Sequence, residues 1–212
     1  FLLAIYPFSF FMVMGYTESL FICLTAAALY YYRTGRPWLA GIFALLSGLT
    51  RVQGLMIITY FLAEYVQSRD WHSKRRLIPI LLAPLGTLIF IGYQWLYLGS
   101  PLAFIEAQTL WGKFSDDYLA SLFATVNPIT LSAFFLFIAL IVITYRQLSK
   151  TLAFYAVCSL LLAVLPGSLI SLNRYILSSF PLFLGLALVY QRLKKPYQAS
   201  IILWWITLSI AF

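Results

Sequence analysis

Charged residues are scarce in this chain. Only 9% of its 212 residues are Asp, Glu, Lys or Arg, and 63% are hydrophobic, whereas soluble domains average about 25% and 45–50%. These proportions exclude an ordinary soluble domain. The apolar runs are continuous instead of alternating, and many approach about 20 residues, the length that a helix needs to cross a bilayer. The sequence therefore predicts an all-α, polytopic bundle of transmembrane helices.

Residue types that bind metals are also few. His72 is the sole histidine of the sequence, in a basic segment that we interpret as a solvated loop, and a zinc site needs more ligands than lie near it. Cys23 and Cys158 fall inside apolar runs, where a thiol is an ordinary small hydrophobic group. These residues therefore indicate neither a metal site nor a disulfide, and they identify no cofactor. Without internal repeats or low-complexity linkers, residues 1–212 are expected to form one integral membrane domain.

The excess of positive charge indicates topology instead of a nucleic-acid partner. The chain has 14 Lys and Arg against 6 Asp and Glu, which gives a net charge of +8. These charges fall in short segments between apolar runs and form no continuous basic face. This distribution is typical of membrane proteins, whose cytoplasmic loops are enriched in Lys and Arg. Membrane lipids are the expected partners, and nucleic acid is not.

Arg51 is the most informative residue, because it lies at the centre of an apolar stretch of 29 residues, 38–66. An arginine at the centre of a membrane helix costs about 2.5–3.5 kcal/mol. Basic segments flank the stretch on both sides, so we predict a hairpin of two short helices over 38–66 with its turn at 50–54. Each arm spans only about 20 Å of a hydrocarbon core of about 30 Å. The Arg51 guanidinium would then face a cavity inside the bundle and bind an anion.

Nine crossings follow from the positions of the loops. They are expected at about 1–14, 17–32, 38–50, 53–66, 77–96, 129–145, 151–169, 175–190 and 199–212. With segment 33–37 inside, the inside segments hold eleven of the 14 Lys and Arg residues, as the positive-inside rule requires. This agreement depends on the hairpin. Most carboxylates and three isolated cations, Arg51, Lys113 and Arg174, then share the outer side.

Two short amphipathic helices are predicted in the long outer segment 98–128, at about 101–126. Pro101 can open the first helix, and Ser115, Asp116 and Asp117 supply a cap and first turn for the second. Such helices would lie at the interface and cover the outer end of the bundle. Asp116 and Asp117 resemble a catalytic pair, but a helix start accounts for them.

Glu18, Arg51 and Arg174 are the candidates for chemistry on the outer side, and each also has a structural interpretation. Glu18 follows Thr17, a predicted N-cap, and either stabilises the helix N-terminus or deprotonates a substrate hydroxyl. Arg51 either bonds carbonyl groups at the turn that also holds Gln53, or binds phosphate. Arg174 either extends to lipid headgroups or completes a phosphate site, since a guanidinium fork suits phosphate oxygens.

Several short stretches resemble the PIG-V family of membrane mannosyltransferases. They follow the order of that family and cover most of the chain. The stretches are Tyr6-Pro7-Phe8-Ser9, Gly15-Tyr16-Thr17-Glu18-Ser19-Leu20-Phe21, Trp38-Leu39-Ala40-Gly41, Leu49-Thr50-Arg51 with Gly54-Leu55, Tyr97-Leu98-Gly99-Ser100-Pro101-Leu102-Ala103-Phe104 with Gln108 and Trp111, and Ser171 with Arg174-Tyr175 and Phe180-Pro181. The family often has proline where this chain has Asn173.

The resemblance implies a GT-C type glycosyltransferase that works on the non-cytoplasmic face of a bacterial plasma membrane or an endoplasmic reticulum membrane. Its donor would be polyprenyl- or dolichyl-phosphate-mannose, and its acceptor a glycan, glycolipid or polymer. In eukaryotes this family adds the second mannose to the GPI anchor precursor. The substrate-binding residues implied, besides the two arginines, are Tyr16, Gln53, Gln108, Trp111 and Tyr175.

The catalytic base is expected upstream of this sequence. The chain begins at Phe1 inside one apolar run and ends inside another, so we expect a fragment that lacks the first spans and the first outer loop. The resemblance places a Trp-Asp motif in that loop. Asp70-Trp71 is reversed and falls on the opposite side, which leaves Glu18 as the best acid within the fragment.

Two other functions compete with the transferase. A transporter or flippase for an anionic lipid or solute also uses broken hairpins with buried arginine, but the cations gather toward one face and no inverted repeat is visible. A non-catalytic scaffold would leave the outer residues unexplained. The sequence favours the transferase, in which Arg51, with help from Arg174, stabilises the leaving phosphate while a carboxylate deprotonates the acceptor.

Overall fold

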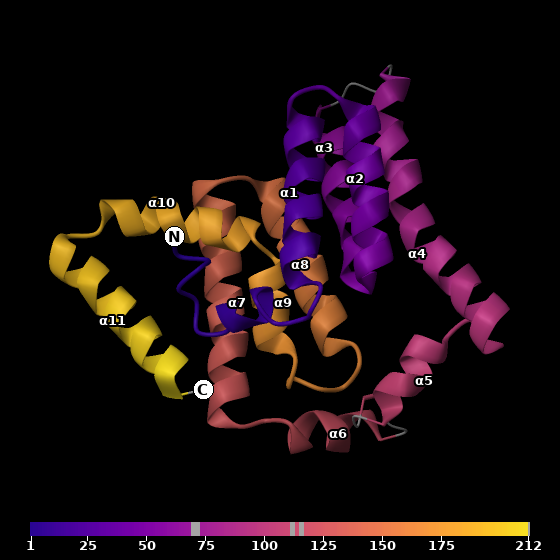
Figure 1. Ribbon diagram of the computed structural model, residues 1–212. Helices are drawn as coiled ribbons and strands as arrows, with labels where there is room; N and C mark the ends of the chain where they lie inside the picture. The colour runs from indigo at the N-terminus through magenta and orange to yellow at the C-terminus, as the bar shows by residue number, and fades with distance from the viewer. Residues whose placement is uncertain (69–72, 111–112, 115–116, 212) are drawn as a thin grey trace.

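Helices form all the regular structure in the part of the chain that the computed structural model describes, which comprises residues 1–68, 73–110, 113–114 and 117–211. The all-α prediction is confirmed there (Figure 1). In chain order the α-helices and 3₁₀ helices (η) are η1 (Ser9–Met12), α1 (Glu18–Arg33), α2 (Pro37–Thr50), η2 (Val52–Met56), α3 (Ile57–Ser68), η3 (Lys74–Leu77), α4 (Ile78–Leu98), α5 (Ala103–Thr109), α6 (Tyr118–Ala124), α7 (Pro128–Gln147), α8 (Lys150–Val164), α9 (Leu172–Ser178), α10 (Pro181–Arg192) and α11 (Lys195–Ala211).

The predicted hairpin over 38–66 is present as α2 and α3. The chain reverses where α2 ends, because Arg51 has an extended backbone (φ −154°, ψ 143°) and η2 then leads into α3. Gly35, just before α2, and Arg75, just after α3, line the same cavity, so both ends of the hairpin lie together (Figure 1). The arms of 14 and 12 residues span about 21 and 18 Å, less than the hydrocarbon thickness of about 30 Å.

Glycine lets the backbones of α2, η2 and α4 approach closely. A Cβ atom on Gly86 of α4 would stand 2.0 Å from the carbonyl oxygen of Leu45 in α2. A Cβ atom on Gly54 would stand 2.5 Å from the backbone of Ser47, so η2 folds directly against α2. No side chain larger than hydrogen fits at these two positions. These contacts fix the turn that carries Arg51.

Hydrogen-bonded caps define the starts of α7 and α8. The Asn127 side chain accepts a hydrogen bond from Thr130 N at 2.9 Å, and the Thr130 hydroxyl accepts one from Asn127 N at 3.0 Å, which is a capping box. Pro128 follows at the first helical position, where its missing N–H has no partner to lose. The Ser149 hydroxyl accepts a hydrogen bond from Leu152 N at 3.1 Å and caps α8, which begins three positions after the last residue of α7.

The predicted crossing over 175–190 is not a single straight helix. The chain forms α9 and α10 there, and the two helices are bent by 76° at Ser179 and Phe180. Pro181 has no N–H to extend the hydrogen-bond ladder of α9, and its ring would clash with the preceding turn. Helix α10 consequently runs across α7 and α8 instead of continuing the direction of α9 (Figure 1).

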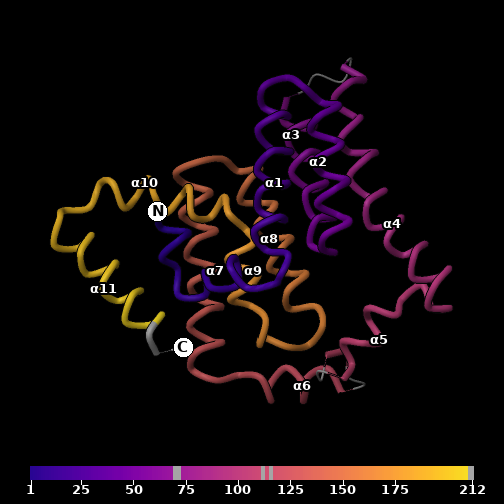
Figure 2. The backbone as a smooth tube through the Cα atoms, viewed as in Figure 1, coloured from indigo at the N-terminus to yellow at the C-terminus, as the bar shows by residue number. Residues whose placement is uncertain are grey.

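The predicted first crossing, residues 1–14, is also wrong. Residues 1–17 contain turns and the short helix η1, and they run past α7 and α9 before α1 begins (Figure 2). Pro7 removes a backbone donor in the middle of the segment. Tyr6 is 2% exposed, and its hydroxyl donates to Asn173 Oδ1 of α9 at 3.2 Å. Tertiary contacts therefore hold this segment in an irregular path.

The two short helices predicted over about 101–126 are confirmed as α5 and α6. Asp117 caps α6 by accepting a hydrogen bond from Ala120 N at 2.9 Å, which supports its structural interpretation. Helix α6 is held to the connection between α8 and α9, where the Ser121 hydroxyl donates to the Gly167 carbonyl at 3.0 Å. Ser115 and Asp116 lie outside the described residues, as do Asp70, Trp71 and His72.

Two hydrophobic clusters form the interior. The first joins residues 1–12 to α7, α9, α10 and α11 around Phe137, Ile176 and Leu182. The second joins α1, α2, α3 and α4 around Ala44, Tyr60 and Phe61, and it also contains Leu152 and Tyr155 of α8. Phe180 packs against both clusters. The ends of α1, α2 and α9 therefore meet where the two clusters adjoin, and these ends carry the candidate site.

Among the described residues, two helical segments are long and apolar enough to cross a membrane. They are Lys74–Leu98 and Pro128–Gln147, and the bent pair of α9 and α10 is a third if it counts as one span. Helices α2 and α8 are apolar but shorter. Membrane-spanning character is thus supported for two or three of the nine predicted crossings.

Candidate functional site

The three predicted charged residues come together. The Arg174 Nε atom donates a hydrogen bond to Glu18 Oε1 at 2.7 Å, and Arg174 Nη2 lies 2.5 Å from the same oxygen. Arg51 forms an ion pair with Glu18 Oε1 through Nη1. One carboxylate oxygen is therefore shared by two guanidinium groups that come from sequence positions 123 residues apart.

Helix ends position all three side chains. Glu18 is the first residue of α1, Arg51 lies between α2 and η2, and Arg174 is in the first turn of α9. Thr17 precedes α1, as expected for an N-cap, but its side chain makes no capping hydrogen bond. Glu18 is therefore positioned by the two arginines and by the start of its helix, where a carboxylate is electrostatically favoured.

The carboxylate is more deeply buried than its partners. Glu18 is 0% exposed, whereas the Arg51 and Arg174 side chains are 15% and 27% exposed. Glu18 Oε2 has no hydrogen-bond partner among the described residues. A buried charge needs such pairing to offset its lost hydration. Together the three groups carry one positive charge, so the cluster attracts anions although it contains a carboxylate.

Aromatic rings enclose the Arg174 guanidinium. Its central carbon lies 4.4 Å from the centroid of the Tyr16 ring and 4.8 Å from that of the Phe11 ring. Cations are attracted to aromatic faces at such distances. The ion pair with Glu18 and the two rings together restrain Arg174, so its guanidinium is preorganised. Tyr16, which the resemblance had indicated, thus belongs to this cluster.

Lys113 is a further cation that our candidate residues did not include. Its Nζ atom donates to the Ser171 hydroxyl at 3.0 Å, which joins the segment between α5 and α6 to the residue before α9. Burial lowers the pKa of the Lys113 ammonium group below its ordinary value, and the charges of Arg174 and Arg51 lower it further. The sequence signal was available, because Lys113 is one of three isolated cations expected on the outer side.

A cavity of about 490 Å³ opens beside this cluster. Arg174 and Lys113 supply its two cationic side chains, and the full lining is Phe8, Phe11, Tyr16, Lys113, Ile170, Ser171, Asn173 and Arg174. Its volume is typical of small-molecule sites, and so is a mostly apolar wall with few polar groups. Arg51 and Glu18 do not line this cavity. The charge of Arg51 is directed to Glu18.

The other predicted substrate-binding residues lie at varying distances from this arrangement. Gln53 is 5% exposed next to Arg51, and its Oε1 atom has no partner among the described residues. Tyr175 follows Arg174 in α9 and packs against the first hydrophobic cluster. Gln108 is in α5 and does not line the cavity. Trp111 lies outside the described residues.

In the described part of the chain, no group of three or more His, Cys, Asp or Glu residues is arranged to hold a metal ion. The chain matches no protein-family model, no curated protein and no solved structure.

Proposed function

We propose that this chain is part of a membrane glycosyltransferase that takes a sugar, mannose by resemblance, from a polyprenyl-phosphate donor. The observation that carries the proposal is the pair of cations, Arg174 and Lys113, on the wall of the 490 Å³ cavity. A lipid-linked phosphate supplies an anion for these groups, and the sugar occupies the remaining space. The acceptor is a glycan, a glycolipid or a polymer, and the protein is a multi-pass membrane protein that works on its non-cytoplasmic side.

Arg174 and Lys113 stabilise the leaving group in this mechanism. The acceptor hydroxyl oxygen forms a bond to the anomeric carbon of the sugar, and the bond between that carbon and the phosphate oxygen breaks. The electron pair of the broken bond stays on the phosphate, whose charge rises from about −1 to about −2. Fixed cations stabilise that developing charge, and removing one such donor typically costs about 10²–10³ in rate.

Glu18 acts as a positioning residue in the proposal. Its Oε1 atom orients Arg174, and the charge of Arg51 keeps the carboxylate ionised in a buried position. Oε2 is buried and Glu18 does not line the cavity, so Glu18 does not reach the attacking hydroxyl. The proton of that hydroxyl goes to another base, which the resemblance implies lies in a Trp-Asp motif.

The proposal is tested by following labelled mannose from polyprenyl-phosphate-mannose into lipid or polymer acceptors in membranes. We expect Arg174→Ala to lower the rate by about 10²–10³. Lys113→Ala should lower it by a smaller factor, and Lys113→Arg should retain most activity because the charge remains. Arg146→Ala is the matched control, since Arg146 is exposed at the end of α7 and lines no part of this cavity. Full transfer by correctly inserted Arg174→Ala protein would refute the assignment.

A flippase or transporter for an anionic lipid or solute is the second candidate. It is favoured by the short hairpin with a partly buried Arg51, since transporters use broken helices of this kind near the middle of a membrane. Proteoliposomes that take up or flip a labelled lipid phosphate in an Arg174-dependent manner, without sugar transfer, would establish this alternative over the transferase.

A further inference from the structure

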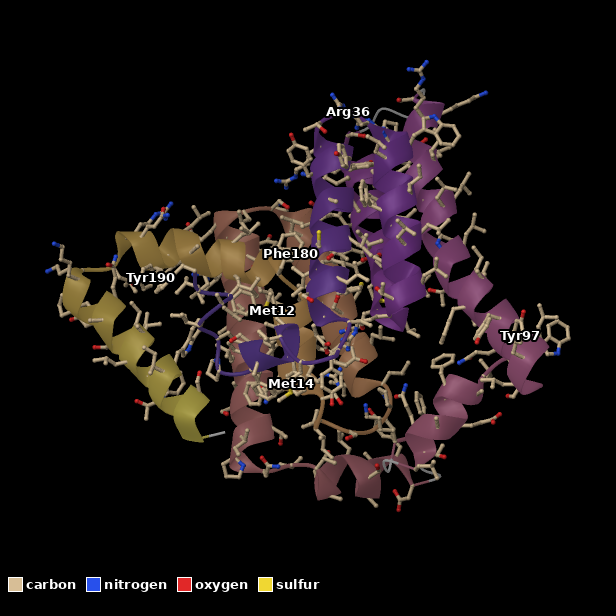
Figure 3. All side chains as sticks on the ribbon, in the orientation of Figure 1. Met12, Met14, Arg36, Tyr97, Phe180 and Tyr190 are labelled. Atoms are coloured by element: carbon tan, nitrogen blue, oxygen red, sulfur yellow. The ribbon has the colours of Figure 1, made fainter. Side chains whose placement is uncertain are left out.

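A second group of cations lies at the end of α1 opposite to Glu18. Three arginines line a cavity of about 260 Å³ there, formed by Tyr32, Arg33, Gly35, Pro37, Ser73, Arg75 and Arg76. A neighbouring cavity of about 520 Å³ shares Gly35, Pro37 and Arg75 with the first and adds Arg36, Trp38 and Leu39. Figure 3 shows Arg36 at the end of the α1–α2 pair, far from Met14 near the first site. Helix α1 has 16 residues and separates the two sites by about 24 Å, so no small ligand reaches both.

Three of the four arginines at this end have no carboxylate partner among the described residues. Arg33, Arg36 and Arg75 form no ion pair with any described residue. Glu64 of α3 accepts a hydrogen bond at its Oε1 atom from the Thr151 hydroxyl at 2.5 Å. Excess positive charge on a concave surface attracts anions more strongly than separate charges on a flat one.

Arg33 is held in place for binding. Its Nε atom donates to the hydroxyl of Tyr60 at 3.1 Å, and Tyr60 is 0% exposed within the second hydrophobic cluster. This bond uses one donor of the guanidinium group and leaves the two terminal nitrogens without a partner among the described residues. A guanidinium fixed at one edge presents the remaining donors at low cost in conformational entropy.

Arg33 also closes an apolar groove. The groove has a volume of about 230 Å³ and is lined by Ala26, Leu29, Tyr30, Arg33, Leu152, Phe180, Pro181 and Leu184. Ala26, Leu29, Tyr30 and Arg33 follow helical spacing along one face of α1, so the groove extends about 10 Å along that helix toward the arginine cavity. Figure 3 shows Phe180 beside the middle of α1, below Arg36. Arg33 is therefore the junction between an apolar groove and a basic cavity.

We propose that this end of the protein binds one anionic phospholipid, with its phosphate in the arginine cavity and one acyl chain in the groove. Basic pockets between membrane helices bind anionic headgroups for electrostatic reasons. The adjoining groove selects a lipid over free phosphate, because only a lipid carries an apolar chain next to its anion. This site is independent of the proposed transferase, whose cavity lies at the other end of α1.

The test measures the apparent Kd of the detergent-purified full chain for phosphatidylglycerol by thermal-shift titration, with phosphatidylcholine as the uncharged lipid. Phosphatidylglycerol should raise the melting temperature, and phosphatidylcholine should not. The double variant Arg36→Gln, Arg75→Gln should bind about 30-fold more weakly, since each arginine near a lipid surface contributes about fivefold. Both side chains have no ion pair among described residues, so their replacement leaves the fold intact.

Two matched controls separate this site from general attraction of basic loops to anionic membranes. Arg146→Gln with Lys194→Gln removes two exposed charges that line neither cavity and should leave the Kd within twofold. Leu184→Trp fills the groove without changing charge and should weaken binding about tenfold, whereas Leu161→Trp, at an exposed position of α8 outside the groove, should not. Equal losses in test and control variants would overturn the proposal, and so would equal stabilisation by inorganic phosphate alone.

Discussion

Replacing Glu18 with glutamine removes the negative charge that Arg51 and Arg174 share. At a charge separation of about 4 Å and an effective dielectric constant of about 20, each guanidinium attracts the carboxylate by about 4 kcal/mol. The two attractions total about 8 kcal/mol, and the desolvation of the fully buried carboxylate offsets several of these. Loss of one partner from a buried ion pair costs about 3–5 kcal/mol. Glutamine keeps an oxygen acceptor, so we expect about 3 kcal/mol of destabilisation.

The assay is thermal unfolding of purified protein in detergent. For a chain of this size about 1 kcal/mol shifts the melting temperature by about 2–4 °C, so Glu18→Gln should lower it by about 6–12 °C. Inorganic phosphate should restore more stability to Glu18→Gln than to the wild type, because the two guanidinium groups are then left without their carboxylate. The control is Glu106→Gln, which changes an exposed carboxylate that accepts a hydrogen bond from Ser100 at 2.6 Å and should shift the melting temperature by less than about 4 °C.

Two results would contradict the reasoning. A melting temperature of Glu18→Gln within about 2 °C of the wild type would mean that the shared carboxylate does not stabilise the meeting of α1, α2 and α9. Equal stabilisation of both proteins by phosphate would mean that the guanidinium groups do not become available when the carboxylate is neutralised.

Three further predictions follow from other contacts. Gly86→Ala should destabilise the protein by more than about 2 kcal/mol in the same thermal assay because its Cβ would meet the Leu45 carbonyl at 2.0 Å, whereas Gly92→Ala on the same helix meets nothing within 4 Å and should be neutral or stabilising. Asn127→Ala should cost about 1 kcal/mol by removing the capping box, measured by denaturant titration. The pKa of Lys113 is lowered by burial, so its ammonium group loses its charge at a lower pH than an ordinary lysine. Anion affinity measured by titration should therefore fall as the pH rises through the pKa of Lys113. Lys113→Arg should abolish that fall, because arginine keeps its charge.

Local sequence signals were sufficient for several elements. The basic segments on both sides of 38–66 and the arginine at its centre predicted the reversal at Arg51, because charge is costly in a membrane wherever it lies. Ser115, Asp116 and Asp117 predicted the start of α6. These signals act within a few residues, so they can be read without knowledge of the fold.

Other features depend on contacts between distant residues. Residues 1–14 are as apolar as a membrane helix, but Tyr6 is bound by Asn173 and buried among α7, α10 and α11, which holds an irregular path. The bend at Ser179 follows from Pro181, although a proline alone does not specify an angle of 76°. Lys113 was visible as an isolated cation, but its bond to Ser171 joins residues 58 apart. No local pattern predicts such a pairing.

The sequence by itself determined that the chain is helical and apolar and that it reverses at Arg51, and it predicted Glu18, Arg51 and Arg174 on one side of the bundle. The tertiary structure decided which charges face the cavity. Arg174 and Lys113 line it, while Arg51 is directed to Glu18 behind it. The physical reason is that one buried carboxylate binds two guanidinium groups from different helices, and only the packing of α1, α2 and α9 determines which guanidinium remains accessible to a ligand.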